Sequence, residues 1–139
     1  MPWTNTFPLP RSISTRTAAA SFTHGLTAVT FLAEAYAPKP DEWILVHTAA
    51  GGLGTFTLDS LVILGVYICR AGLLLTQLAT ARGVKVIGTT SSEEKARIAK
   101  ENGAEEMIIY TKEDTVARVL EITGGEGVHA VFDGVGKDT

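Results

Sequence analysis

The stretch that decides the fold is Trp43-Ile-Leu-Val-His-Thr-Ala-Ala-Gly-Gly-Leu-Gly54, an apolar run followed by a glycine-rich turn. Glycines at such a turn let the backbone bend sharply, and the free amides at the start of a following helix attract a phosphate. The pattern therefore predicts a buried strand and a turn of the nucleotide-binding type. A Gly-Gly-x-Gly string is weakly specific alone, so its weight depends on the elements that follow it.

The helix that should leave this turn is displaced along the chain. Leu73-Leu-Leu-Thr-Gln-Leu-Ala-Thr-Ala-Arg-Gly83 has the pattern of that helix, but residues 55–72 separate it from Gly54. Joining Gly54 to Leu73 restores a continuous strand, turn and helix, so we interpret 55–72 as an insert. Our leading hypothesis is a retained short intron or a faulty gene model, because the insert keeps the reading frame. Phosphate capture requires the helix to begin at the turn, so we expect weak or absent nucleotide binding.

Downstream of the insert, hydrophobic periods of two and of about 3.6 residues alternate. The sequence predicts strands at 43–48, 84–89, 107–110 and 128–133, and helices at 16–36, 73–83, 92–102 and 112–123. Regular alternation with short links predicts parallel strands joined by right-handed crossovers. The predicted fold class is α/β, a partial doubly wound parallel sheet of the Rossmann type that is incomplete at both ends, since a full sheet of this kind has about six strands.

Composition excludes several classes of protein. The chain has 12 basic and 15 acidic residues, a formal charge of −3, and no basic stripe, so nucleic acid is not an expected partner. Cys69 has no second cysteine to pair with, which indicates a reducing, cytoplasmic location. The acid-free N-terminal region with Arg11 and Arg16 leaves an organellar transit peptide as the alternative. Three scattered histidines and one thiol do not form a zinc ligand set, so no metal is expected.

The apolar stretch 60–79 has about the length needed to cross a bilayer. Arg70 and Gln77 interrupt it, and its second half already belongs to the predicted helix 73–83. We expect no membrane contact, and a membrane-tethered module that uses 60–79 remains the alternative.

The end of the second predicted strand indicates which nucleotide is bound. An NAD site usually offers a carboxylate there, whereas this chain has Thr89-Thr90-Ser91-Ser92 with Lys95 one turn further on. Hydroxyl and ammonium groups favour the 2′-phosphate of NADP(H). In the alternative interpretation Ser91 caps the helix, Glu94 completes a capping box and Lys95 is solvated, and both interpretations can hold together. Glu93 and Glu94 would repel a phosphate if they pointed at it.

Six segments resemble the quinone oxidoreductase and zeta-crystallin branch of the zinc-free medium-chain dehydrogenases. They are 13–20, 25–28, 46–54, 88–95, 99–104 and 132–139. The resemblance implies an NADPH-dependent reductase of a quinone or enone that forms homodimers. It also implies that 1–36 is an N-terminal segment with a domain-linking helix, and that 37–139 is a partial Rossmann NADPH-binding domain interrupted by the insert 55–72.

The resemblance also indicates which positions bind the cofactor. They are Thr27, Gly51, Gly52, Leu53, Gly54, Ser91, Ser92, Lys95, Tyr110 and Gly134. Gly134 stands where the family often has a serine, so a contact there can come only from its backbone. Family members carry a further domain that closes over the nicotinamide, and no catalytic residue is assigned in this chain. We expect the chain to be inactive on its own; the alternative is a non-catalytic fragment that at most binds nucleotide or pairs with full-length subunits.

Overall fold

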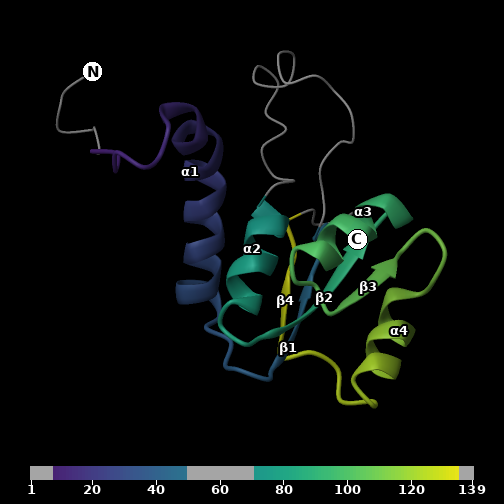
Figure 1. The fold of residues 1–139 in the computed structure, drawn as a ribbon. Coiled ribbons are helices and arrows are strands. Elements are labelled where there is room, and N and C mark those ends of the chain that lie inside the picture. Colours follow the sequence, from purple (N-terminus) through teal and green to yellow (C-terminus); the bar gives the residue numbers. More distant parts are fainter. Residues whose placement is uncertain (1–7, 50–70, 135–139) are drawn as a thin grey trace.

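A four-stranded parallel sheet forms the centre of the molecule, whose computed structural model describes residues 8–49 and 71–134 (Figure 1). Its strands are β1 (Trp43–Val46), β2 (Lys85–Thr90), β3 (Glu106–Ile109) and β4 (Ala130–Phe132). The strand order β3-β2-β1-β4 matches the first four strands of the doubly wound order 3-2-1-4-5-6. The predicted α/β fold class is confirmed, although β1 and β4 are each shorter than expected.

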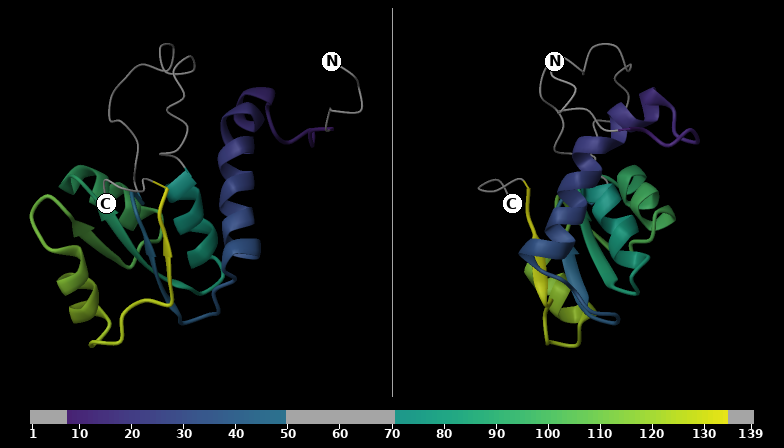
Figure 2. Two further views of the ribbon diagram at one scale, coloured as in Figure 1. Left: turned by 180° about the vertical axis from the view of Figure 1, so that it is seen from behind. Right: turned by 90° about the vertical axis from the view of Figure 1, so that its left-hand side faces the viewer.

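Helices cover both faces of the sheet (Figure 2). Those on one face are α1 (Thr15–Thr30), α2 (Ala71–Thr80) and α3 (Glu93–Glu101), and α4 (Thr115–Ile122) lies on the other. Successive strand residues point to opposite faces, so Ile44 and Val46 join one core cluster while Leu45 joins the other. This two-sided burial explains why the strands read as continuous apolar runs rather than as alternating ones.

Helix α2 is the helix predicted at 73–83, and it begins at Ala71 in the part of the chain that the structure describes. Its residues Leu75 and Ala79 are buried against the sheet. The second half of the apolar stretch 60–79 therefore belongs to the protein core, as expected, while residues 60–70 lie outside the described residues. Within 8–49 and 71–134, no helix is long and apolar enough to cross a membrane.

The predicted helix 16–36 is present but ends in a different geometry. Ser14 caps it by accepting a hydrogen bond from the Thr17 amide at 3.0 Å. After α1 the chain continues as one π-helical turn, η2 (Phe31–Ala35), closed by the Tyr36 amide on the Phe31 carbonyl at 3.1 Å. Such turns are rare, and hydrophobic periodicity does not distinguish them from α-helix.

The link from η2 to β1 is fixed by the carboxylate of Glu42. It accepts hydrogen bonds from the Lys39 amide at 2.9 Å and from the Tyr36 hydroxyl at 3.1 Å. The Lys39 amide, followed by the Tyr36 hydroxyl, lowers the pKa of Glu42 below its usual value. Partial desolvation, together with the hydrogen bond and the negative charge of Glu42, raises the pKa of Tyr36.

Local signals set the other helix ends. Gly83 and Gly103, which follow α2 and α3, have φ of 79° and 104°, a region that favours glycine. Helix α4 begins at Thr115 rather than at the predicted Lys112, because the Asp114 side chain accepts a hydrogen bond from the Ala117 amide at 2.7 Å.

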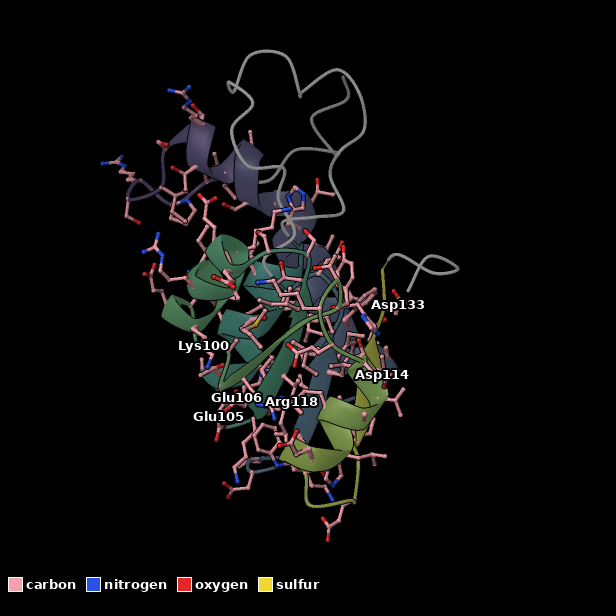
Figure 3. All side chains as sticks on the ribbon, turned by 90° about the vertical axis from the view of Figure 1, so that its right-hand side faces the viewer. Lys100, Glu105, Glu106, Asp114, Arg118 and Asp133 are labelled. Atoms are coloured by element: carbon pink, nitrogen blue, oxygen red, sulfur yellow. The ribbon has the colours of Figure 1, made fainter. Side chains whose placement is uncertain are left out.

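Charged side chains gather on the side of the molecule formed by α3, β3 and α4 (Figure 3). Lys100 pairs with Glu106 at 3.6 Å, and Arg118 pairs with Glu113 at 3.6 Å and with Glu121 at 2.6 Å. None of these residues lines the pocket described below. The partners are substantially exposed, so these pairs keep this surface solvated and contribute little to stability.

Candidate functional site

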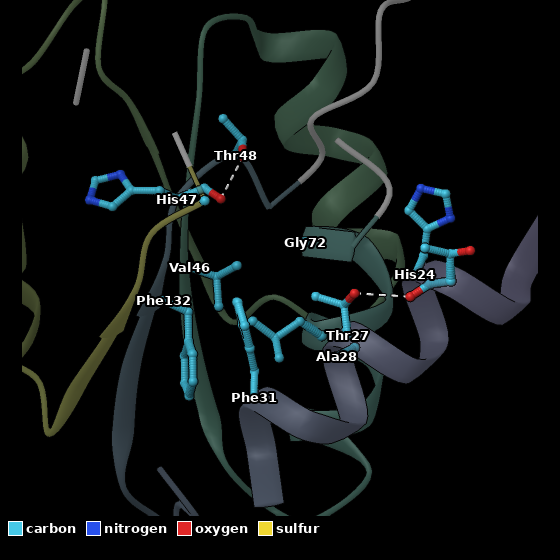
Figure 4. Close-up of a pocket in the computed structure, with 12 residues that line it drawn as sticks. His24, Thr27, Ala28, Phe31, Val46, His47, Thr48, Gly72 and Phe132 are labelled. Atoms are coloured by element: carbon cyan, nitrogen blue, oxygen red, sulfur yellow. Dashed lines mark hydrogen bonds between the residues drawn. The ribbon is translucent and has the colours of Figure 1, made fainter. Parts of the chain in front are cut away.

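A pocket of about 330 Å³ lies between α1 and the carboxyl ends of β1 and β4 (Figure 4). Its lining comes from α1, η2, β1, α2 and β4 and from the residues that follow the two strands: Thr23, His24, Thr27, Ala28, Phe31, Val46, His47, Thr48, Gly72, Leu75, Phe132 and Gly134. Strand β1 is paired with β2 on one side and β4 on the other, and the strand order reverses there. This is the position at which doubly wound sheets bind ligands.

The end of β1 is held by the side chain of Thr89, which is fully buried in β2. The Thr89 hydroxyl oxygen accepts a hydrogen bond from the Thr48 amide at 3.2 Å and lies 3.0 Å from Nδ1 of His47. Thr48 has φ of 54°, and its hydroxyl donates to the His47 carbonyl at 2.7 Å. A single buried hydroxyl thus fixes the residues at which the chain leaves β1 toward the glycine-rich turn.

The opposite wall of the pocket comes from α1 and the start of η2. The Thr27 hydroxyl donates to the Thr23 carbonyl at 2.9 Å within the helix, so its oxygen remains available as an acceptor. Phe31 stacks on Phe132 of β4, with ring centroids 6.0 Å apart and planes inclined by 17°. This aromatic pair joins α1 to the sheet and closes the apolar side of the pocket (Figure 4).

A second group of polar side chains follows β2 at the same edge of the sheet. Lys95 Nζ lies 3.5 Å from the Ser91 hydroxyl, and the Ser92 hydroxyl accepts from the Lys95 amide at 3.5 Å. The N-cap of α3 is Ser92, so the alternative in which Ser91 caps the helix is wrong. With Ser92 at this position the third helical residue is Lys95, and a capping box with Glu94 cannot form. Ser91 is therefore not used by the helix.

One of the two acidic residues at the start of α3, Glu93, is paired with a cation outside this group. The Glu93 carboxylate lies 2.5 Å from Lys112 Nζ, a contact that lowers the pKa of Glu93. The negative charge of Glu93 is thereby balanced by a cation that follows β3. The repulsion expected between Glu93 and a phosphate is correspondingly reduced.

Tyr110, which follows β3, is 46% exposed, so its ring is accessible to a ligand. Its neighbour Thr111 donates a hydrogen bond to the Ser91 carbonyl at 3.2 Å, and the Tyr110 amide donates to the Thr90 carbonyl at 3.1 Å. These bonds bring the ends of β2 and β3 together beside Lys95.

The predicted site residues thus fall into two groups at one edge of the sheet. Thr27 and Gly134 line the pocket, while Ser91, Ser92, Lys95 and Tyr110 follow β2 and β3. Gly51, Gly52, Leu53 and Gly54 lie outside the described residues.

Sequence reasoning placed the Thr89 hydroxyl among those that favour a 2′-phosphate, but this side chain is fully buried and binds the end of β1 instead. It also missed His47 and Phe132 as parts of the site. Their signal was their place at or next to the carboxyl end of a predicted strand, where ligands of such sheets bind.

No three His, Cys, Asp or Glu side chains within 8–49 and 71–134 are grouped so that they could hold a metal ion. The expectation of a zinc-independent protein stays a prediction.

The chain is similar in sequence to proteins of known name. A quinone oxidoreductase of Salmonella typhimurium is 45% identical over 131 residues, which cover 94% of this chain and 35% of that protein. The chain belongs to the quinone oxidoreductase family. A family profile described as zinc-binding dehydrogenase matches residues 71–139, and a 2-haloacrylate reductase of Burkholderia is 37% identical over 115 residues, 83% of this chain and 29% of that protein.

A solved structure of the quinone oxidoreductase family shows the same fold. The structure of Escherichia coli quinone oxidoreductase complexed with NADPH has a TM-score of 0.80 and 43% identity, and the match covers 96% of this chain and 35% of that one. The chain thus spans about a third of the length of the quinone oxidoreductases that it matches.

Proposed function

We propose that this chain forms an NADPH-binding domain of a quinone reductase. The observation that carries the proposal is the group of Ser91, Ser92 and Lys95 after β2, where an NAD site would offer a carboxylate. The crystallised E. coli relative is complexed with NADPH, which supports the same choice of cofactor.

The 2′-phosphate end of the cofactor binds at α3. Lys95 supplies a positive charge, and Ser91 donates its hydroxyl proton, because its oxygen already accepts from Lys95. The oxygen of Ser92 is occupied as the helix cap, but its proton is free to donate to a phosphate. Tyr110 flanks the adenine ribose from β3. In this arrangement Glu93 stays paired with Lys112 and is no longer an obstacle.

The other end of the cofactor lies in the pocket at β1 and β4. Bound NADPH supplies a hydride there, and the residues of this chain position it and exclude water. Thr27 offers a hydroxyl oxygen and Gly134 offers backbone atoms, while the Phe31 and Phe132 pair provides an apolar floor. The amides of 51–54 would hold the pyrophosphate.

The substrate is a small quinone that accepts the hydride at the mouth of this pocket. An activated alkene is the second candidate, because one relative of the chain is a 2-haloacrylate reductase. Both substrates carry an electron-poor carbon–carbon double bond that is conjugated with a carbonyl group. Quinone reduction belongs to a whole protein of the relatives' length, and we expect the 139-residue chain by itself to give no turnover. Homodimer formation and a cytoplasmic location remain predictions.

The proposal is tested by following the melting temperature of the chain with increasing NADPH or NADH. A ligand that binds only the folded state raises the melting temperature by an amount that grows with the logarithm of its concentration divided by its Kd. NADPH should raise it more than NADH at equal concentration. The variant that lacks residues 55–72 should bind NADPH more tightly than the full chain, because its turn leads directly into α2.

Because the full chain is expected to bind NADPH weakly or not at all, the decisive variant, Lys95→Ala, is made in the chain that lacks residues 55–72. Lys100→Ala on the same helix is its matched control, because Lys100 pairs with Glu106 instead. Loss of a charged hydrogen bond to phosphate should weaken NADPH binding by about 10- to 100-fold, with little effect on NADH. Lys100→Ala should leave both unchanged. Equal shifts by NADPH and NADH, or an unaltered NADPH response in Lys95→Ala, would contradict the proposed phosphate site.

A further inference from the structure

The start of α2 is in unusually close contact with the end of β1. A Cβ atom built on Gly72 would lie 2.5 Å from the Thr48 carbonyl oxygen, 3.2 Å from its carbonyl carbon and 3.3 Å from the Ala49 Cα. All three are backbone atoms. No side-chain rotation can relieve such a contact, so a side chain at position 72 would push α2 away from the strand.

The backbone on the strand side of this contact is fixed in place. Thr48 is bound through its amide to the buried Thr89 hydroxyl, and the Ala49 amide donates to the Thr89 carbonyl at 3.1 Å. On the helix side, the Thr76 hydroxyl donates to the Gly72 carbonyl at 2.9 Å, and Thr76 is fully buried. The strand side cannot yield without breaking the bonds to Thr89, whereas the Thr76 bond lies within α2 and moves with the helix. A side chain at 72 would therefore displace α2 and unpack its buried residues, so the contact depends on glycine at 72.

Close packing of a helix on the preceding strand is the role of the last glycine in a dinucleotide-binding turn. By sequence alone, Gly54 holds that place before the insert. The printed sequence, however, reads Gly54 before residue 55 and Gly72 before Leu73, so removal of 54–71 and removal of 55–72 leave the same polypeptide. The boundaries of the insert are therefore undetermined by sequence and can be chosen only by structure.

We propose that Gly72 has taken over this packing role, and that the insert is better described as residues 54–71. The motif's own last glycine is then Gly72, and it keeps α2 seated on β1 although the turn is interrupted. Insofar as the chain binds NADPH as proposed above, Gly72 is a positioning residue that sets the place of α2 relative to the cofactor phosphates.

The test compares alanine variants in two backgrounds, the full chain and the chain that lacks 54–71. Gly72→Ala should lower the melting temperature by about 5 to 10 °C in both, because the clash with Thr48 is the same. Gly54→Ala in the full chain should change it by less than about 2 °C. Gly25→Ala in α1 is the control, since a Cβ there meets nothing within 4 Å and should raise the melting temperature slightly.

A neutral or stabilising Gly72→Ala in the full chain, or a loss at Gly54→Ala as large as at Gly72→Ala, would overturn the assignment. Should the Gly72 variant not fold, nuclear Overhauser contacts in the unmutated chain decide instead. Gly72 Hα and Ala49 Hα should give a cross-peak, and absence of that peak overturns the proposal. These measurements need no nucleotide, so a failure of NADPH binding would contradict the proposed function alone.

Discussion

The buried hydroxyl of Thr89 offers the sharpest test of how the end of β1 is held. In Thr89→Val a methyl group replaces the hydroxyl at nearly constant volume, so no cavity forms. The Thr48 amide loses its acceptor at 3.2 Å and His47 Nδ1 loses its partner at 3.0 Å. An unsatisfied half-buried amide costs about 1 to 3 kcal/mol, and the second hydrogen bond adds about 1 kcal/mol.

The free energy of unfolding should therefore fall by about 2 to 4 kcal/mol, which corresponds to a melting temperature lower by roughly 10 °C. Urea denaturation followed by far-ultraviolet circular dichroism measures this change, and hydrogen exchange should become faster at the Thr48 amide. Thr90→Val is the matched control. Thr90 is adjacent and 2% exposed, and the bonds that hold Thr48 and His47 go to Thr89 instead.

The control variant should stay within about 1 kcal/mol of the unmutated chain. If Thr89→Val and Thr90→Val are equally stable, the buried hydroxyl does not hold the end of β1, and the reasoning about the site's rigidity is refuted.

Three further changes test the packing and the pH dependence. Gly88→Ala should cost about 1 to 3 kcal/mol of unfolding free energy in urea, because its Cβ would lie 2.5 Å from both the Ala49 Cβ and the Met107 Sδ. Phe31→Ala should cost about 2 to 3 kcal/mol by loss of the aromatic stack, whereas Leu26→Ala on the exposed side of α1 should cost less than about 1 kcal/mol. Glu42→Gln should be destabilising at pH 7 and less so at pH 3.5 in the same assay.

The sign of the Glu42 prediction follows from its lowered pKa. A carboxyl group whose pKa is lower in the folded state stabilises the fold above its unfolded pKa, the ordinary value of a glutamate, and loses that contribution as the pH falls through the folded value. A stability difference between Glu42→Gln and the unmutated chain that did not shrink on acidification would contradict this.

For Gly88→Ala, a second change of Ala49→Gly should restore part of the lost unfolding free energy, and no restoration would contradict the clash with Ala49 as the cause.

Strand and helix alternation was sufficient to predict the sheet, its parallel direction and the helix on each crossover. These features depend on local periodicity, which is written into short windows such as Trp43–Val46 and Lys85–Thr90. The predicted site residues within the described part of the chain lie at one edge of the sheet for the same reason, and their role in cofactor binding stays a prediction. Thr27 and Lys95 could be assigned only through the family resemblance and the position after β2.

Features that depend on contacts between distant segments were not predictable. The pairing of Phe31 with Phe132 joins residues a hundred positions apart, and nothing in either segment specifies the other. The helix cap was misplaced by one residue because Ser91 and Ser92 have the same cap propensity, and only the backbone decides between them. Likewise, Gly54 and Gly72 are indistinguishable in the sequence, and the choice depends on the position of the Thr48 carbonyl.

The left-handed conformation of Thr48 has a consequence for the whole domain. A β-branched residue with φ of 54° is held against its own preference, at a cost on the order of 1 to 3 kcal/mol. The free energy of unfolding is therefore smaller than it would be with a residue that adopts this conformation readily. The strain is located at the pocket, which Thr48 lines. In return, the direction of the chain at Thr48 is already set before a ligand binds. The binding free energy is then not reduced by the entropy cost of ordering this residue.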